Sequence, residues 1–195
     1  TAILWHQDTD IADDLDLIVI AGGFSYGDYL RSGAIASKSP IMKAVKSHAE
    51  AGKKVLGICN GFQVLTETHM LPGALKRNEH LHFISKHHNL KVASNSNDFL
   101  GKFDNSDVVN IPIAHHDGNF FIDEAGLREL YANDQVLLHY CDKDGEISNP
   151  NGSVDSIAGI CIKAKNVVGL MPHPERAMED VLGSYDGIKM LEGLM

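Results

Sequence analysis

The sequence predicts an α/β fold in which an open, mostly parallel sheet carries helices on both faces and is extended by antiparallel strands. The first half alternates apolar runs of strand length with segments of helical periodicity. The second half contains mainly short apolar runs separated by turn sequences. With 195 residues, of which 44% are hydrophobic and 22% charged, the chain is expected to form a single globular domain.

Two buried strands and two helices alternate in the first half. The strands are expected at residues 15–21 and 54–58, and the helices between residues 40 and 52 and over 62–70. Ser39 is expected to cap the first helix, with Pro40 in its first turn and Gly52 at its end. This β-α-β-α order implies parallel strands with helices packed on them.

The second half is richer in strands. Seven are expected, at residues 81–84, 90–93, 108–113, 120–122, 135–140, 157–163 and 167–171. Residues 142–145 and 149–152 are strong turn signals between two of these strands. Residues 183–195 are predicted to form a closing helix.

Composition excludes several classes of partner. The net charge is −9, and no cluster of lysine and arginine is present, so neither a nucleic acid nor an anionic membrane is an expected partner. No apolar run approaches the roughly 18 residues that a membrane-spanning helix needs. Three cysteines fit a reducing, cytoplasmic location, and Cys141 and Cys161 are expected to be core residues.

The most informative stretch is the junction between the strand at 54–58 and the helix that follows it. Cys59 lies at the apex of this junction, with Gly57 before it and Gly61 after it. Such a strand-to-helix elbow presents a nucleophile at the carboxyl end of a sheet. The helix N–H groups beside the thiol favour its thiolate and can bind an oxyanion. The pattern predicts a nucleophilic cysteine, and the alternative is a buried structural cysteine.

A histidine and a carboxylate follow the last predicted strand. His173 lies between two prolines, which hold its backbone in a stiff turn. We expect Glu175 to reach the imidazole Nδ1 atom. Cys59, His173 and Glu175 would then be the nucleophile, base and orienting carboxylate of acyl transfer. The alternatives are a histidine that caps a turn and a glutamate that is solvated or lies at a helix N-terminus.

Oxyanion donors are expected from two backbone segments. One is the N–H of Asn60, directly after the nucleophile. The other is the glycine-rich loop 22–28, which begins at Gly22 and Gly23 and can approach a ligand closely. The alternative for this loop is an ordinary strand-to-helix turn. Because the loop and Cys59 both follow the carboxyl ends of strands, they can face one crevice.

Two histidine pairs lack a metal-binding pattern. Adjacent residues of a strand point to opposite faces, so His87-His88 and His115-His116 are not expected to chelate, and no metal site is predicted. The second pair follows a strand, and its loop is expected to line the crevice. No phosphate-binding glycine motif is present, so the chain is not expected to bind ATP or NAD itself.

Taken together, these residues resemble the class I (triad) glutamine amidotransferases. The resemblance runs over nearly the whole sequence. More specifically, the chain resembles the glutaminase subunits of phosphoribosylformylglycinamidine synthase, from purine biosynthesis. Its most specific pieces are residues 22–31, 57–63, 71–75, Arg77-Asn78 and 171–176. The resemblance implies a flavodoxin-like class I glutaminase fold.

The resemblance also implies particular roles. Cys59 would attack the glutamine carboxamide, and His173 would protonate the departing ammonia and then activate the water that hydrolyses the thioester. Gly23 and Asn60 would stabilise the oxyanion, and Gln63 would help to hold L-glutamine.

Partners follow from the same resemblance. Ammonia would pass to a large ATP-dependent synthetase subunit that aminates formylglycinamide ribonucleotide, often with a small third subunit. ATP and Mg would be used by that synthetase, and no cofactor is expected in this chain. The docking face is expected near Leu30-Arg31 and in the strand-rich second half.

Two departures from the family pattern stand out. The family has a further β-α unit before the strand that residues 1–5 resemble, so the chain is expected to lack an N-terminal β-α unit. The second departure is His116, because the family loop reads more like His-Gly-Glu-Gly at this point. A different pocket wall and an altered substrate affinity are therefore expected there.

Three other interpretations remain. The chain could be a triad glutaminase that serves another synthetase, such as those making CTP, GMP or anthranilate. It could be a cysteine hydrolase of the intracellular peptidase type, although those usually have histidine directly after the nucleophile, where Asn60 stands here. It could also be a non-enzymatic, truncated scaffold.

Overall fold

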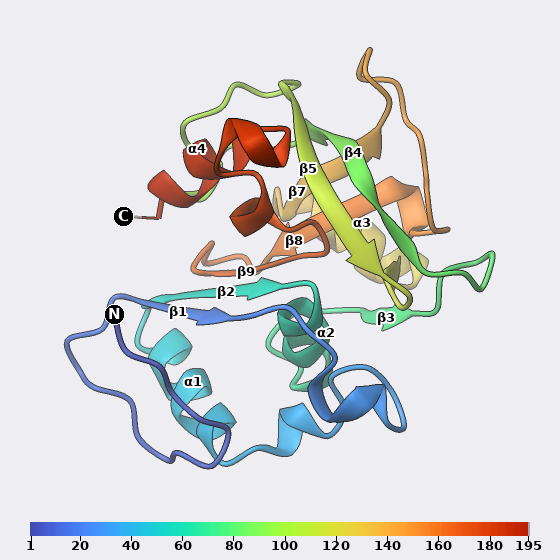
Figure 1. Ribbon diagram of the computed structural model, residues 1–195. Helices are drawn as coiled ribbons and strands as arrows, with labels where there is room; N and C mark the ends of the chain where they lie inside the picture. Colours follow the sequence, from blue (N-terminus) through green and yellow to red (C-terminus); the bar gives the residue numbers. More distant parts are fainter. Residues whose placement is uncertain (195) are drawn as a thin grey trace.

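The computed structural model describes residues 1–194, which form one large curled sheet with helices packed on it (Figure 1). The sheet has seven strands in the order β1-β2-β9-β8-β7-β4-β5. These strands are β1 (Leu17–Ile20), β2 (Lys54–Ile58), β4 (Ile84–Val92), β5 (Val108–His115), β7 (Val136–Cys141), β8 (Ile157–Cys161) and β9 (Val167–Leu170). Two short strands, β3 (Ala74–Lys76) and β6 (Asn119–Phe121), form a separate antiparallel pair.

The parallel and antiparallel parts of the sheet meet at β9. Strands β1, β2 and β9 run parallel, whereas β9, β8, β7, β4 and β5 pair antiparallel in turn. The sheet curls so far that its last strand returns to β9. The backbone N–H of His173, just beyond β9, donates to the carbonyl of Pro112 in β5 over 2.8 Å. This curl brings the end of β5 to the carboxyl ends of β2 and β9.

Four helices accompany the sheet. They are α1 (Ile41–Glu50), α2 (Asn60–Glu67), α3 (Glu124–Ala132) and α4 (Asp186–Glu192). Helices α1 and α2 lie on one side of β1 and β2, and α4 lies on the other side of the sheet (Figure 1). The predicted α/β fold with helices on both faces and an antiparallel extension is therefore confirmed.

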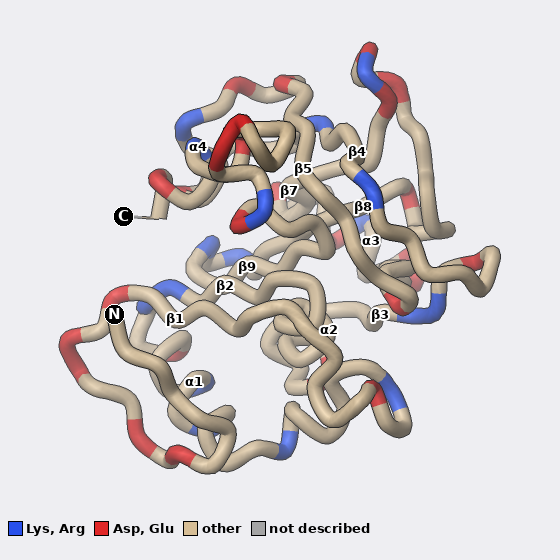
Figure 2. Tube along the Cα trace, in the orientation of Figure 1, with Lys and Arg blue, Asp and Glu red and all other residues tan. Residues whose placement is uncertain are grey.

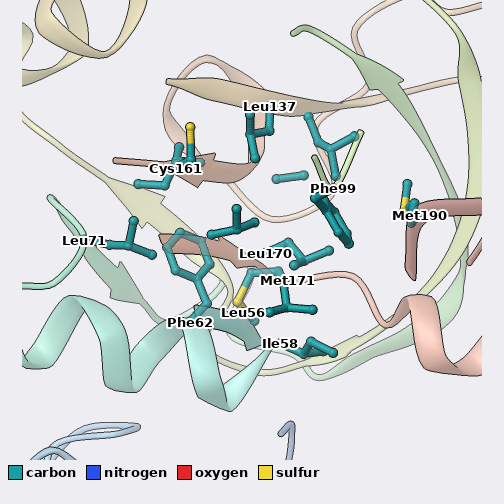
Figure 3. Close-up of a cluster of buried hydrophobic side chains, with 14 of the residues drawn as sticks. Leu56, Ile58, Phe62, Leu71, Phe99, Leu137, Cys161, Leu170, Met171 and Met190 are labelled. Atoms are coloured by element: carbon teal, nitrogen blue, oxygen red, sulfur yellow. The ribbon is translucent and has the colours of Figure 1, made fainter. Parts of the chain in front are cut away.

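Helix α2 is held against the sheet by close packing in the core (Figure 3). The ring of Phe62 is fully buried beside Leu56 and Leu170. Gly169 of β9 makes room for this ring, because a Cβ atom there would lie 2.3 Å from a carbon of Phe62. A fit this close fixes the position of the helix start, which carries Cys59.

Several predicted elements agree with the structure. The strand at 54–58 is β2, and the runs at 108–113, 135–140, 157–163 and 167–171 contain β5, β7, β8 and β9 with small shifts of their ends. Gly145 and Gly152 have φ of 80° and 87°, which confirms that the two predicted turns need glycine. Cys141 and Cys161 are fully buried, as expected of core residues.

Three predictions about elements are wrong. Ser39 does not cap α1: Pro40 is already helical, and the buried Ser39 hydroxyl has no partner among the described residues. Residues 81–84 are not a separate strand, because Leu81 adopts a left-handed φ of 62° in a turn and β4 begins only at Ile84. The closing helix is shorter than residues 183–195, since Gly183 has a φ of 91° and α4 begins at Asp186.

Along the trace of residues 1–194, lysines and arginines are scattered and form no long basic stretch (Figure 2). Acidic residues gather along the N-terminal segment, at Asp8, Asp10, Asp13, Asp14 and Asp16. Among the described helices, none has the length and apolar character that crossing a membrane requires.

Candidate active site

Cys59 occupies a strained elbow between β2 and α2. Its φ of 50° and ψ of −102° are unusual for a residue with a side chain, and such strain is retained where the surrounding structure enforces it. The two neighbouring glycines enforce it here. A Cβ atom on Gly61 would lie 2.0 Å from the carbonyl oxygen of Ile20, and one on Gly57 would lie 2.5 Å from Leu65. The glycine pattern is therefore required for α2 to start this close to the sheet.

His173 is held by a carboxylate on one side and has a free nitrogen on the other. Its Nδ1 atom lies 2.6 Å from Oε1 of Glu175, the contact expected from the sequence. An Nδ1–H that donates to this carboxylate leaves Nε2 as the basic nitrogen. The ring is only 1% exposed, and Nε2 has no hydrogen-bond partner among the described residues. The base is thus oriented and unoccupied.

Gly22 shows that the histidine and the cysteine lie together. A Cβ atom built on Gly22 would lie 2.8 Å from Cε1 of His173 and 3.5 Å from Cβ of Cys59. Both side chains therefore flank one small volume, which a glycine leaves open. The curled sheet completes it from the opposite side, because the Cys59 thiol donates to the carbonyl of Ala114 at 3.6 Å.

The surroundings of Cys59 favour its protonated thiol, although the N–H groups at the start of α2 act in the opposite direction. Burial raises its pKa from 9.0 to about 12, and the backbone N–H of Asn60 and the charge of Arg176 lower it only in part. This rise disfavours the thiolate by about 4 kcal/mol. A helix N-terminus contributes about 1 kcal/mol in the opposite direction. Burial prevails because Cys59 is only 5% exposed.

The expected oxyanion donors are the N–H of Asn60, beside the sulfur, and that of Gly23, which follows Gly22 in the loop after β1. The N–H of Asn60 opens α2 beside the sulfur and has no partner within the helix. Gly23 has a φ of 147°, which a residue with a side chain rarely adopts. A cavity of about 400 Å³ lies against this loop on the side of α1; Gly22, Gly23 and Asn60 line it in part, whereas Cys59 and His173 do not. The arrangement suits backbone donation to a developing negative charge, and the role of each group stays a prediction.

Gln63 belongs to a buried chain of side-chain hydrogen bonds. Its Oε1 accepts from Asn60 at 2.8 Å, and its Nε2 donates to the carbonyl of Asp117 at 2.7 Å. The Asn60 Oδ1 atom in turn accepts the N–H of Ser25 at 3.3 Å. Gln63 therefore connects loop 22–28, through Asn60, to the loop after β5. Its expected contact with L-glutamine stays a prediction.

The two histidines after β5 have different surroundings. His116 turns to the carbonyl of Leu81, 3.1 Å from its Nε2 atom, and is half-buried. His115 points inward, is 2% exposed, and lies close enough to His173 for that residue's charge to lower its pKa. Burial is the larger cause and lowers the pKa of His115 to about 4, so this ring is neutral near pH 7.

Asn78 is the residue that holds the loop after β5, and sequence reasoning gave it no role. Its Nδ2 donates to the carbonyls of His82 and His115, and its Oδ1 accepts from His115 and from the N–H of Gly118. Asn78 is fully buried. The alternation of buried residues along β5 could have indicated that His115 points inward, because positions 111, 113 and 115 share the buried face of the strand. Nothing local to Asn78 indicates its bonds.

Metal ligands are not assembled in the described part of the chain. Within residues 1–194 no group of three or more histidine, cysteine, aspartate or glutamate side chains could hold a metal ion.

Comparison with known proteins agrees with this arrangement. A family model for the CobB/CobQ-like glutamine amidotransferase domain matches residues 4–189. Phosphoribosylformylglycinamidine synthase subunit PurQ from Sulfurimonas denitrificans is 70% identical over 195 residues, covering 100% of this chain and 87% of that protein. The subunit PurQ from Wolinella succinogenes is 62% identical, covering 98% of this chain and 86% of that protein.

The fold has a close counterpart among solved structures. The structure of PurLQS from Thermotoga maritima includes a chain that matches with a TM-score of 0.84 and 41% identity, over 94% of this chain and 80% of that one. The elbow, the His-Glu pair and these similarities over nearly the whole length lead to one assignment. The chain belongs to the CobB/CobQ-like glutamine amidotransferase family, within the branch of PurQ-type amidotransferase subunits of phosphoribosylformylglycinamidine synthase, an enzyme of purine biosynthesis.

Proposed function

We propose that the chain hydrolyses L-glutamine to glutamate and ammonia through a thioester on Cys59. The observation that supports this most strongly is the meeting of three groups: a strained nucleophile, an unoccupied buried imidazole nitrogen and the Glu175 carboxylate 2.6 Å from His173. An acyl-transfer site needs a nucleophile, a base and a group that orients the base. Each is supplied here by a residue that the sequence indicates.

The protonated thiol determines the first step. As the sulfur attacks the carboxamide carbon, its proton moves to Nε2 of His173, and the N–H groups of Gly23 and Asn60 stabilise the oxyanion. The C–N bond then breaks, and His173 returns the proton to the leaving ammonia. Water loses a proton to the same nitrogen and attacks the thioester. Glutamate leaves as the thiol is reprotonated.

We further propose that the ammonia is used by a separate synthetase. The relatives are named as subunits of phosphoribosylformylglycinamidine synthase, and this chain is similar to them over its whole length. The synthetase would convert formylglycinamide ribonucleotide to formylglycinamidine ribonucleotide with ATP and Mg, together with a small third subunit. This chain itself would need no cofactor.

The face through which the chain would meet the synthetase is a rim of exposed apolar residues. Phe24, Tyr29 and Leu30 lie on the loop after β1, and Leu30 is 82% exposed. Phe83 lies across from them, with its ring centroid 6.1 Å from that of Phe24. Apolar surface of this kind on a crevice rim is typical of an interface. Arg31 was also expected in the docking face. Its Nε–H donates to Oε1 of Glu67 at 2.8 Å, so its guanidinium is already paired within the chain.

The test compares two nitrogen sources in the complex reconstituted with its synthetase. Cys59→Ala is expected to abolish product formation from glutamine and to retain formation from ammonium salts. Cys161→Ala, a change at another buried cysteine, is expected to retain both. Loss of both activities in Cys59→Ala would indicate a structural cysteine. Full glutamine-dependent activity in that variant would exclude the thioester.

A further inference from the structure

The end of β5 and the loop that follows it contact the nucleophile elbow through two carbonyl groups. The carbonyl of Ala114 accepts from the Cys59 thiol at 3.6 Å. The carbonyl of Asp117 accepts from Nε2 of Gln63 at 2.7 Å. Gln63 in turn accepts from the side chain of Asn60, whose backbone N–H is an expected oxyanion donor. The position of this loop therefore affects both the nucleophile and the donor beside it.

Asn78, which follows β3, holds the same loop from its other side. Its backbone N–H donates to the carbonyl of His116 at 2.8 Å, and its Nδ2 donates to the carbonyls of His82 and His115 at 2.9 and 3.0 Å. Its Oδ1 accepts the N–H of Gly118 at 3.1 Å. Because backbone carbonyls only accept and backbone N–H groups only donate, these contacts allow one orientation of the Asn78 amide.

This orientation determines which nitrogen of His115 carries the ring proton. Oδ1 of Asn78 lies 3.1 Å from Nδ1 of His115. The oxygen can only accept, so Nδ1 carries the proton and donates it. Nε2 is then the unprotonated nitrogen, and it has no hydrogen-bond partner among residues 1–194. The bond to Asn78 is therefore what orients the His115 ring.

The loop packs directly on this ring. A Cβ atom on Gly118 would lie 2.3 Å from Nδ1 of His115 and 2.6 Å from its Cγ, and the ring is 2% exposed. The N–H of Gly118 and the Nδ1–H of His115 meet the same oxygen of Asn78. Any displacement of the ring therefore moves the loop backbone, including the carbonyl of Asp117 that holds Gln63.

We propose that His115 is a positioning residue of the glutaminase: its Nδ1–H bond to Asn78 holds the loop after β5 against the elbow and so keeps the oxyanion donor of Asn60 in place. The inference rests on the proposed function, because it assigns a residue to the reaction of that site. His115 acts through Asp117 and Gln63 and contacts no reacting atom. An oxyanion donor stabilises the transition state more than the bound substrate, so kcat is the constant that responds.

Two variants of equal shape isolate this bond in the complex with the synthetase. His115→Asn keeps an N–H donor at the position of Nδ1, whereas His115→Leu places a methyl group there, and both remove the outer part of the ring. In His115→Leu we expect kcat for glutamine to fall by about 10- to 100-fold with KM unchanged, because a small displacement of catalytic groups has effects of this size. His115→Asn is expected to keep kcat within about threefold. The ammonia-dependent rate should be unchanged in both.

The same pair of variants separates positioning from stability. Asparagine brings a buried oxygen without a donor, so His115→Asn is expected to be the less stable variant in chemical denaturation although it is the more active. A merely structural role predicts the opposite order of activity. His88→Leu, at a half-buried histidine of β4, is the control and is expected to change neither kcat nor KM. Equal kcat values of the two His115 variants, or a loss confined to KM, would overturn the proposal.

The protonation of the ring can be measured without an enzymatic assay. In NMR spectra of the isotope-labelled chain at about pH 7, His115 is expected to have a protonated Nδ1 and an unprotonated Nε2. Its signals are assigned by their loss in His115→Leu. A proton on Nε2 would overturn the bond to Asn78 and the proposal with it. If the unaltered complex used ammonia but never glutamine, the proposed function itself would fail, and His115 would lose its role whatever its tautomer.

Discussion

At the scale of single residues, the central feature is a nucleophile that is not ionised before substrate arrives. Burial favours the protonated Cys59 thiol, and His173, whose ring lies on the same side of Gly22 as Cys59, has an Nε2 atom without a hydrogen-bond partner among the described residues. Proton transfer and attack are therefore coupled, and the base must be oriented when substrate binds. The 2.6 Å contact with Glu175 supplies that orientation. Stabilisation of the oxyanion contributes more than prior ionisation in such a site.

The raised pKa predicts how Cys59 reacts with a small alkylating agent. Because the pKa is about 12, the thiolate fraction rises with every increase in pH below that value. The rate of alkylation by iodoacetamide should therefore increase about tenfold per pH unit between about pH 7 and pH 10, with no plateau. Rates measured by mass spectrometry of the Cys59 peptide check this. A plateau near neutral pH would reveal a thiolate–imidazolium pair instead.

Glu175 predicts a second effect on catalysis. Glu175→Gln keeps the size of the side chain and removes the charge that fixes the tautomer of His173 and stabilises its protonated form. We expect kcat for glutamine to fall by about 10²- to 10⁴-fold with the ammonia-dependent rate unchanged. Glu179→Gln, at an exposed position nearby, serves as control and should have no effect. A loss below about threefold for Glu175→Gln would mean that the carboxylate does not orient the base.

At the scale of elements, the elbow depends on the distance between α2 and β1. A methyl group on Gly61 would lie 2.0 Å from the carbonyl oxygen of Ile20, so the helix start would have to move. We expect Gly61→Ala to destabilise the fold by about 2 kcal/mol or more and to abolish glutaminase activity. Chemical denaturation and the glutamine assay measure the two effects.

Gly101→Ala provides a comparison for that change. The nearest atom to its added methyl group is 3.1 Å away, so a much smaller loss of stability is expected. Equal stability of Gly61→Ala and Gly101→Ala would show that the close approach of α2 is not what the glycine permits.

Elements with strong local patterns were predictable, and those built by pairing were not. Strand β2 was predicted at its observed bounds because a short apolar run is followed directly by the glycine elbow. Helix α3 was missed, since it contains Gly126 and buries only Leu130. Strand β4 was divided in two because its middle residues are polar, and only pairing with β5 and β7 makes them a strand.

The same division holds for the site. Cys59, His173 and Glu175 each lie in a recognisable local motif, and the structure brings them together. Asn78 lies in a motif piece of the family, but its structural part could not be read from the sequence. Its contacts join loops that are distant in the sequence, and they depend on the curl of the whole sheet.

At the scale of the whole molecule, the curled sheet is what closes the crevice. It brings β5 to β9 through the bond from His173 to Pro112, and so places loop 115–118 opposite loop 22–28. The apolar rim of Phe24, Tyr29, Leu30 and Phe83 lies on the loop after β1 and on the segment directly before β4. Ammonia released at Cys59 would leave through this rim, which is why we place the synthetase there.

The rim gives a prediction for assembly. Leu30→Asn removes an exposed apolar side chain. Asparagine tolerates the left-handed φ of 69° at this position, so the backbone is expected to stay unchanged. We expect the affinity for the synthetase to fall at least about tenfold, with no change in thermal stability. Ile147→Asn, in the connection between β7 and β8 that projects from the molecule, is the control (Figure 1). Sedimentation or calorimetric titration measures the affinity of each variant for the synthetase. Equal affinities of Leu30→Asn and Ile147→Asn would show that the interface does not include Leu30.

The most direct measurement of the central claim is covalent labelling with a glutamine-analogue electrophile, 6-diazo-5-oxo-L-norleucine, in the assembled complex. Peptide mapping should find one adduct, on Cys59 and on neither Cys141 nor Cys161, and L-glutamine should protect against it. His173→Ala should slow its formation strongly. Labelling of the three cysteines to similar extents, or a Cys59 adduct that forms as fast without His173, would contradict the account.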